Sequence, residues 1–233
     1  MRRSISTGVV LGIICLLWSQ AGRSPEEWIS GMLTAYSRPG SFQQKATVSA
    51  SMMTSRNPQG EVLQQMVYTY TLEAPAKLNL TVQDMFSGKT TRAQSDGTYL
   101  SVQKPNQEAQ KVLIAGSGLA LLEQLIAHDI VPTYDMVFVF GGKAKQEEFR
   151  KQISQVRIDT EDEKSVVLTA RIRNEKNRED ELQLVLDKAT ATMRRFRVTT
   201  HAKIEGSEGA FALLMEFEPL KEGGEPKPLP PAP

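Results

Sequence analysis

The chain has 233 residues, of which 40% are hydrophobic and 24% charged, and its 28 basic and 27 acidic residues give a formal net charge of +1. A chain of this length can bury a sizeable core, and one domain is the simplest organisation. The near-neutral charge gives no reason to expect nucleic acid as a partner, because binding to phosphate backbones depends on an excess of lysine and arginine.

Residues 1–21 have the pattern of a cleavable export signal. A basic start, Arg2-Arg3, precedes the apolar run Val9–Trp18, and Ser19 and Ala21 supply small residues at the two positions that a signal peptidase reads. The apolar run is shorter than the roughly 20 residues that span a bilayer, which makes an uncleaved membrane anchor the weaker alternative. We therefore predict an exported protein that is cleaved after Ala21.

Cys15, the only cysteine, lies inside this signal segment. Ile14 stands just before it, whereas a lipoprotein signal needs a small residue there, so we do not expect acylation. The mature chain would have no cysteine, which removes disulfides, thiolate catalysis and cysteine metal sites. Without Arg2-Arg3 its 28 basic residues fall to 26 against 27 acidic ones, a formal charge near −1.

The mature chain is predicted to open with a helix. Ser24-Pro25-Glu26-Glu27 supplies a capping serine, a proline for the first turn and two carboxylates for the positive end of the helix dipole. Trp28, Met32 and Tyr36 recur every four residues, which makes one side of the helix apolar, and Arg38-Pro39-Gly40 ends it. The helix either packs on a sheet or closes one end of a cavity, and the sequence does not choose between these.

A long strand is predicted over Ser41–Thr54, followed by a turn at Arg56–Gly60. The stretch Gln64–Gln103 then predicts four antiparallel strands, because apolar and polar residues alternate with the two-residue period of a half-buried strand. Glu73-Ala74-Pro75-Ala76 separates the first two, since proline cannot donate to a strand ladder. Ser95-Asp96-Gly97-Thr98 predicts the tight turn of a hairpin between the last two.

Four further segments follow before the second half of the chain. Lys111–Ile114 predicts a short strand, and Leu119–Ile126 predicts a helix with apolar residues at helical spacing. Met136–Phe140 is a continuous apolar run of strand length bounded by glycines, and we predict a strand there. Gln146–Lys151 is charged and predicts a short helical turn.

The second half predicts an antiparallel meander, because turn residues recur about every dozen residues. A proline-rich tail, residues 222–233, has hardly any apolar content and is predicted to be disordered. The predicted strands of the meander are Ile153–Asp159, Ser165–Ile172, Glu181–Leu186, Met193–Thr200 and Gly209–Phe217.

The sequence contains no convincing catalytic or metal-binding motif. His128 and His201 are far apart, and neither lies at the spacing of a zinc site. Acidic clusters such as Glu161-Asp162-Glu163 fall in predicted turns, where a solvated loop explains them better than a pair of catalytic carboxylates. Gly116-Ser117-Gly118 lacks the lysine and the longer glycine pattern of a phosphate loop. We therefore predict a protein that is not an enzyme and needs neither metal nor cofactor.

Three short motifs, together with the order of the elements, resemble the LolA-like superfamily, which includes the periplasmic lipoprotein carrier LolA, LolB and RseB. The motifs are Phe42-Gln43-Gln44, the run Tyr70–Leu78 with its Ala-Pro corner, and Ser95–Leu100 followed by Lys104-Pro105. The resemblance covers roughly residues 25–217 in element order.

The resemblance implies an α+β, mostly antiparallel fold, in which a strongly curved sheet forms a half-open β-barrel with helices covering its concave apolar face. It implies one domain over residues 22–221, between the signal peptide and the tail, and a periplasmic location. Ala74 stands before Pro75 where the carrier typically has an arginine, so the resemblance does not extend to that arginine's part in cargo handover.

Two functions from different classes are predicted. In the first, a monomer holds lipid or lipoprotein acyl chains in the concave face without catalysis, as a lipoprotein carrier does. In the second, an envelope protein–protein interaction or stress-sensing module uses the same face, with the proline-rich tail as a ligand for a partner. A hydrolase is a third reading, and it lacks a nucleophile with its base.

The predicted ligand-contacting residues come from the strands of the Gln64–Gln103 stretch and from the helix after them. If the strand parity were reversed, these side chains would instead fill the convex packing layer. The residues are Tyr68, Tyr70, Leu72, Leu78, Leu80, Val82, Leu100, Val102, Leu122 and Ile126.

Overall fold

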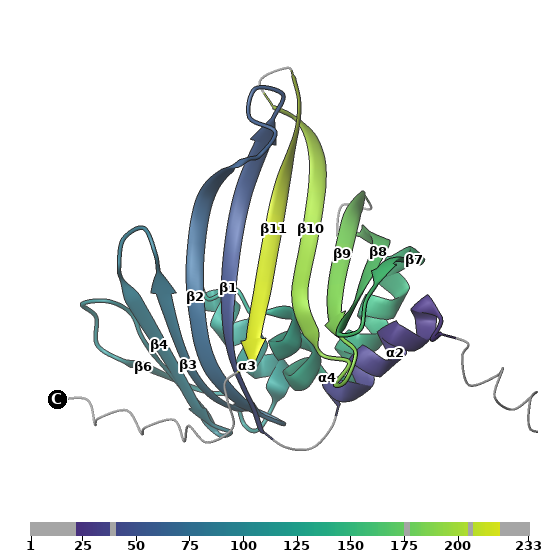
Figure 1. Ribbon diagram of the computed structural model, residues 1–233. Helices are drawn as coiled ribbons and strands as arrows, with labels where there is room; N and C mark the ends of the chain where they lie inside the picture. The colour runs from purple at the N-terminus through teal and green to yellow at the C-terminus, as the bar shows by residue number, and fades with distance from the viewer. Residues whose placement is uncertain (1–21, 38–40, 175–177, 205–206, 220–233) are drawn as a thin grey trace, which may run out of the picture.

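The computed structural model describes residues 22–37, 41–174, 178–204 and 207–219, so the predicted signal peptide and tail lie outside the described residues. Within these ranges, eleven strands form one sheet in the order β6-β5-β4-β3-β2-β1-β11-β10-β9-β8-β7 (Figure 1). All neighbouring strands are antiparallel. The two end strands have a neighbour on one side alone, so the curved sheet of the described chain stays an open half-barrel, as predicted.

The helices are α2 (Pro25–Ala35), α3 (Gly118–Ala127) and α4 (Tyr134–Gln152). The strands are β1 (Ser41–Thr54), β2 (Glu61–Glu73), β3 (Lys77–Asp84), β4 (Thr90–Asp96), β5 (Tyr99–Gln103), β6 (Gln110–Leu113), β7 (Ile153–Glu161), β8 (Ser165–Arg173), β9 (Glu179–Asp187), β10 (Met193–Ile204) and β11 (Ser207–Pro219).

β1 is the middle strand of the sheet and joins its two arms. It pairs with β2 on one side and with β11, the last strand of the chain, on the other, so that Val48 lies opposite both Met66 and Met215. One arm continues from β2 to β6, and the other runs from β11 back to β7. In Figure 1 the helices lie behind the lower part of the sheet, and the upper ends of β1, β2, β10 and β11 extend well beyond them.

The N-terminal helix begins where the sequence predicts. The Ser24 hydroxyl accepts a hydrogen bond from the backbone N–H of Glu27 at 3.2 Å, and the Glu27 carboxylate accepts one from the Ser24 N–H at 2.7 Å. This reciprocal capping box satisfies two of the donors that a helix start leaves free. At the other end, the Tyr36 hydroxyl accepts a hydrogen bond from the backbone N–H of Met193, which ties the helix to β10.

The strand predicted over Met136–Phe140 is wrong, because these residues form the first half of α4. Met136, Phe138, Val139 and Phe140 are all buried, and a segment that is buried on every side shows no helical period in its sequence. The turn predicted at Gln146–Lys151 is the second half of the same helix, after a non-helical break at Gly142. Packing against the sheet outweighs the strand propensity of the valine and phenylalanines here.

The hairpin predicted at Ser95-Asp96-Gly97-Thr98 is confirmed. β4 ends at Asp96, β5 begins at Tyr99, and Gly97 between them has a φ of 98°. The Asp96 carboxylate accepts hydrogen bonds from the N–H groups of Thr98 and Tyr99 at 2.7 and 2.8 Å. The positive φ and the side-chain acceptor explain why Asp-Gly stands at this turn.

Cross-strand pairs separate a helix-covered face from a helix-free face, which no described helix covers. Residues directly opposite each other on paired strands point to the same side of the sheet. Phe196 of β10 stacks on Tyr134 of α4, with ring centroids 3.8 Å apart, and therefore lies on the helix-covered face. Its neighbours Arg195 and Arg197 point to the helix-free face, because successive side chains of a strand alternate.

Candidate functional site

The apolar face predicted from the sequence lies beneath the helices. Nine of its ten predicted residues are at most 6% exposed and belong to the main hydrophobic core: Tyr68, Tyr70, Leu72, Leu78, Leu80, Val82, Leu100, Val102 and Leu122. Tyr70 lies opposite Leu80, and Leu80 opposite Ala93, so the row continues across β2, β3 and β4. The predicted alternation is confirmed, and packed side chains fill this part of the concavity. Contact of these residues with a ligand stays a prediction.

Ile126, the tenth residue, does not share this face, and placing it there is wrong. It is 62% exposed. The buried positions of α3 are Gly118, Leu121, Leu122 and Leu125, which follow the i, i+3, i+4, i+7 pattern of one helical stripe. Ile126 falls outside this stripe, since the helix turns by about 100° per residue.

Aromatic rings from α4 fill the concavity on the side of the second arm. Phe138 and Phe149 meet edge to face with ring centroids 5.1 Å apart, and Tyr36 of the α2 C-cap lies 6.1 Å from Phe138. Such pairs stabilise a core beyond the area that they bury. The helices are therefore part of the packed core.

A buried carboxyl group links α4 to the sheet. Asp135 is 0% exposed; the Tyr70 hydroxyl donates to its Oδ2 at 2.7 Å, and the Thr133 hydroxyl donates to its Oδ1 at 2.5 Å. In the described chain no cationic side chain forms an ion pair with it. Burial raises the pKa of Asp135, and the hydrogen bonds from Thr133 and Tyr70 oppose the rise. Burial, with the nearby Asp135 charge, also raises the pKa of Tyr70.

The helix-covered face stays open where the sheet extends past the helices. A cavity of about 310 Å³ lies there, and its lining residues, which we name the apolar shelf, are Ala50, Ser51, Tyr134, Val198, Thr200, Phe211, Ala212 and Leu213. Leu213 of β11 lies opposite both Ala50 of β1 and Val198 of β10. Phe211 at the rim is 43% exposed. The shelf therefore presents apolar side chains from three adjacent strands to solvent.

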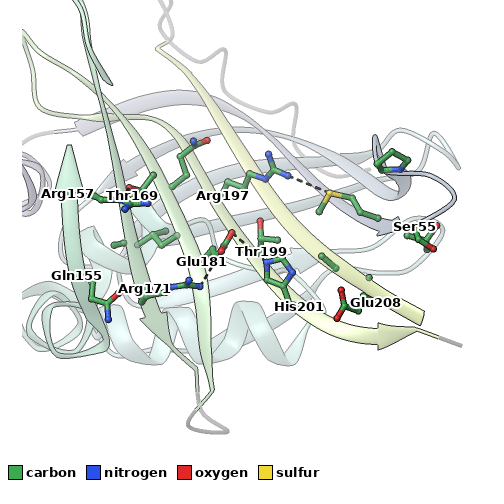
Figure 2. A pocket seen from close by; sticks show the side chains of 18 residues that line it. Ser55, Gln155, Arg157, Thr169, Arg171, Glu181, Arg197, Thr199, His201 and Glu208 are labelled. Atoms are coloured by element: carbon green, nitrogen blue, oxygen red, sulfur yellow. Dashed lines mark hydrogen bonds and ion pairs between the residues drawn. The ribbon is translucent and has the colours of Figure 1, made fainter. Parts of the chain in front are cut away.

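A larger cavity lies on the helix-free face. It measures about 790 Å³, and we name it the polar cleft (Figure 2). Its lining includes residues of β7 to β11, of the end of β1 and of the β1–β2 turn: Gln155, Arg157, Thr169, Arg171, Glu181, Gln183, Arg197, Thr199, His201, Glu208, Ala210, Met53 and Ser55. Arginine, threonine and glutamine side chains make this cleft chemically unlike the shelf.

Two kinds of contact hold the charged groups of the polar cleft. The Glu181 carboxylate contacts two partners: its Oε1 lies 3.3 Å from Nη1 of Arg171, and its Oε2 lies 3.6 Å from Nε2 of His201. Arg197 donates to the sulfur of Met53 at 3.8 Å, and Arg157 donates through Nε to the Thr169 hydroxyl at 3.0 Å. Figure 2 shows Glu181 beside Arg171 and His201, with Arg157 and Arg197 apart from this group.

The sequence predicted the strands that form this cleft but not the cleft. Thr169, Gln183 and Arg197 stand at alternating polar positions of predicted strands, and such positions usually face solvent. Their alignment depends on the register of β8 to β10, which brings residues more than ten positions apart into one row. The alternating arginines of β10, Arg195 and Arg197, were the available signal.

The histidines take separate places. His128 is the C-cap of α3, and His201 belongs to the polar cleft. Within the described ranges, no three or more histidine, cysteine, aspartate or glutamate side chains are grouped so that they could hold a metal ion. Among the helices of the described chain, none has the length and apolarity needed to cross a membrane.

Several solved structures are similar to this chain. A chain of the MucA/MucB complex of Pseudomonas aeruginosa is 13% identical over 85% of this chain, with a TM-score of 0.39. A putative outer membrane lipoprotein-sorting protein domain from Vibrio parahaemolyticus is 9% identical over 87% of this chain and 94% of its own, with a TM-score of 0.31. A LolA superfamily protein from Nitrosomonas europaea is 11% identical over 86% of this chain and 95% of its own, with a TM-score of 0.27.

The resemblance to LolA-like proteins that the sequence motifs predict thus reappears among solved structures, as a distant likeness. This chain spans 59% of the matched chain in the MucA/MucB complex. No protein-family model matches the sequence, and no curated protein matches it. The identities and TM-scores assign no ligand to this chain.

Proposed function

We propose that this chain is an exported, non-catalytic binding protein whose apolar shelf holds an acyl chain of a lipid or lipoprotein. The observation that carries the proposal is the cavity of about 310 Å³ on the helix-covered face, lined by Ala50, Val198 and Leu213 and edged by the half-exposed Phe211. Ligand sites are typically concave, mostly apolar and at least about this large. The binding needs no nucleophile or metal.

The free energy of binding in this proposal comes from apolar burial. Each methylene group that leaves water contributes about 0.8 kcal/mol, so even a short stretch of acyl chain in the shelf gains several kcal/mol before the cost of ordering it. The nine buried residues predicted from the sequence continue the same face beneath the helices. In the proposal they form the base of the site, and the shelf residues contact the chain first.

The main test measures binding of a fluorescent fatty acid to the full chain. Phe211→Ser removes apolar surface from the rim, and Ala50→Asp places a carboxylate on the floor, so both variants should weaken binding by about tenfold or more. Leu113→Ser is the matched control, because Leu113 is 60% exposed on the edge strand β6 and lies outside the shelf. Equal affinities for the three variants, or no binding by the unaltered chain, would contradict the proposal.

A second candidate is an apolar segment of an envelope protein on the same shelf. The volume of the shelf, about 310 Å³, accommodates one or two large side chains as well as it accommodates part of an acyl chain. Native mass spectrometry after gentle purification separates the two. A co-purified lipid mass supports the first candidate, whereas a lipid-free chain that retains a protein partner lost in Phe211→Ser supports the second.

A further inference from the structure

One cross-strand row of the helix-free face carries an arginine at each end. Arg157 lies opposite Thr169, Thr169 opposite Gln183, and Gln183 opposite Arg197. All four residues line the polar cleft. Adjacent strands are about 4.8 Å apart, so three steps along the row separate the backbones of the two arginines by about 14 Å. The row therefore offers two cations with hydrogen-bonding side chains between them.

Neither end arginine forms an ion pair with a carboxylate of the described residues. No carboxylate of the described residues lies within ion-pair distance of Arg157 or Arg197, whereas Arg171, Arg173, Arg194 and Arg195 each have one. Arg197 is half-buried beside the sulfur of Met53, a weak acceptor that leaves its guanidinium unneutralised. Guanidinium groups bind carboxylates through two parallel hydrogen bonds, so each end of the row is suited to one carboxylate.

We propose that the polar cleft binds an extended acidic segment of a protein partner, with two carboxylates spaced four residues apart. An extended chain rises about 3.4 Å per residue, so residues i and i+4 lie about 14 Å apart, which equals the separation of the backbones of Arg157 and Arg197 along the row. The two carboxylates point to the same side, because side chains of an extended chain alternate with a period of two. The side chain at i+2 then lies over Thr169 and Gln183.

The mixed charge of the cleft favours a peptide over a phosphate group. Glu181 and Glu208 also line it, and both would repel the concentrated negative charge of a phosphate. A peptide with separated carboxylates can place each one on an arginine and keep neutral residues beside the glutamates. Met53 and Ala210 add apolar surface for such neutral residues.

The test uses a fluorescein-labelled nine-residue peptide with glutamate at positions 3 and 7 and serine, threonine and valine elsewhere. Fluorescence anisotropy with the full chain should show binding that weakens with added salt. Arg157→Gln and Arg197→Gln should each weaken it by about tenfold, because each removes a charge-assisted hydrogen bond. A peptide with glutamates at positions 3 and 6 should also bind about tenfold more weakly than the first peptide, because its two carboxylates point to opposite sides of the extended chain.

Arg195→Gln is the matched control. Arg195 lies on the same face and is paired with Glu216 at 2.7 Å, outside the polar cleft, so its loss should leave peptide binding unchanged. Equal binding by the unaltered chain and the Arg157→Gln, Arg197→Gln double variant would overturn the proposal. So would binding of phosphatidylglycerol vesicles or inorganic phosphate that depends on the same arginines while the peptide does not bind.

The polar cleft and the apolar shelf lie on opposite faces, so their tests are independent. Phe211→Ser should weaken fatty acid binding and leave peptide binding unchanged. Arg197→Gln should weaken peptide binding and leave fatty acid binding unchanged. Failure of the shelf proposal therefore leaves the cleft proposal standing.

Discussion

At the scale of single residues, the most informative group is the buried carboxyl of Asp135. Its hydrogen bonds to Tyr70 and Thr133 join the start of α4 to β2 inside an otherwise apolar core. A buried polar group is expensive unless it is fully hydrogen-bonded, and this one accepts from two hydroxyls and from backbone N–H groups. The position of α4 over the sheet therefore depends on a small number of polar contacts.

Removing one of these donors should destabilise the fold. In Tyr70→Phe the Asp135 carboxyl loses its 2.7 Å hydrogen bond, and the expected loss is about 1–3 kcal/mol in the free energy of unfolding. Tyr68→Phe is the matched control, because Tyr68 is equally buried and none of the hydrogen bonds of the described chain involves its side chain. Urea denaturation measures both variants, and equal losses would contradict this role of Asp135.

The pH dependence of stability should also report on Asp135. Its native pKa is raised by burial, so the native state holds this proton more tightly than the unfolded state does. The contribution of this group is therefore most favourable below its unfolded pKa, near 3.8, and is lost as the pH rises through its native pKa. Asp135→Asn removes that loss, so the variant should gain stability relative to the unaltered chain as the pH rises.

Unfolding free energies of both proteins from pH 4 to pH 8 give the measurement. Exposed carboxyls such as Asp84 and Asp96, whose native pKa values are lowered by backbone hydrogen bonds, contribute the opposite slope, but they do so equally in both proteins. The difference between the two curves isolates Asp135. Parallel curves would show that its ionisation does not differ between the native and unfolded states.

At the scale of elements, the start of α3 is a close contact between three parts of the chain. A Cβ atom on Gly118 would lie 2.1 Å from the carbonyl oxygen of Phe140 in α4 and 2.5 Å from that of Pro75 in the β2–β3 corner. Both neighbours are backbone atoms, which cannot move aside as a flexible side chain can. The absence of a side chain at this position is therefore what lets α3, α4 and the corner meet.

Gly118→Ala should consequently destabilise the protein by about 1–3 kcal/mol through overpacking. The control is Gly31→Ala in α2, where the nearest atom to a new Cβ is 3.6 Å away and no left-handed backbone is involved. Alanine exceeds glycine in helix propensity by up to about 1 kcal/mol, so this change should stabilise the protein. Thermal denaturation separates the two, and a tolerated Gly118→Ala would mean that the three elements are free to shift apart.

At the scale of the whole molecule, one curved sheet supports two different surfaces. The helix-covered face is mostly apolar, and it is filled near the helices and open at the shelf. The helix-free face carries the polar cleft, which draws residues from β7 to β11 and from the β1–β2 turn. Because the same strands contribute alternate residues to both surfaces, a change confined to one face should leave ligand binding on the other intact.

Local patterns account for most of the correct predictions. The capping sequence at Ser24, the Asp-Gly turn at Gly97 and the alternation around Tyr68 and Leu80 depend on residues close together in the chain. The strand prediction for Met136–Phe140 was wrong because it depended on long-range packing. This helical segment is buried on most sides, so its sequence shows no alternation of apolar and polar residues with the helical period. The placement of Ile126 was wrong because this residue follows the buried Leu125 directly and lies about 100° further around the helix, outside the buried stripe.

The sequence by itself determined the class of fold, the strands, two of the helices and the apolar face, because periodicity and turn chemistry are local properties. Only the tertiary structure decided that the helices fill most of that face and that an open shelf remains beyond them. The strand register in the tertiary structure also places Arg157 and Arg197 at the two ends of one cross-strand row. Register between strands distant in sequence, and the packing of helices onto a sheet, arise from contacts that no single segment encodes.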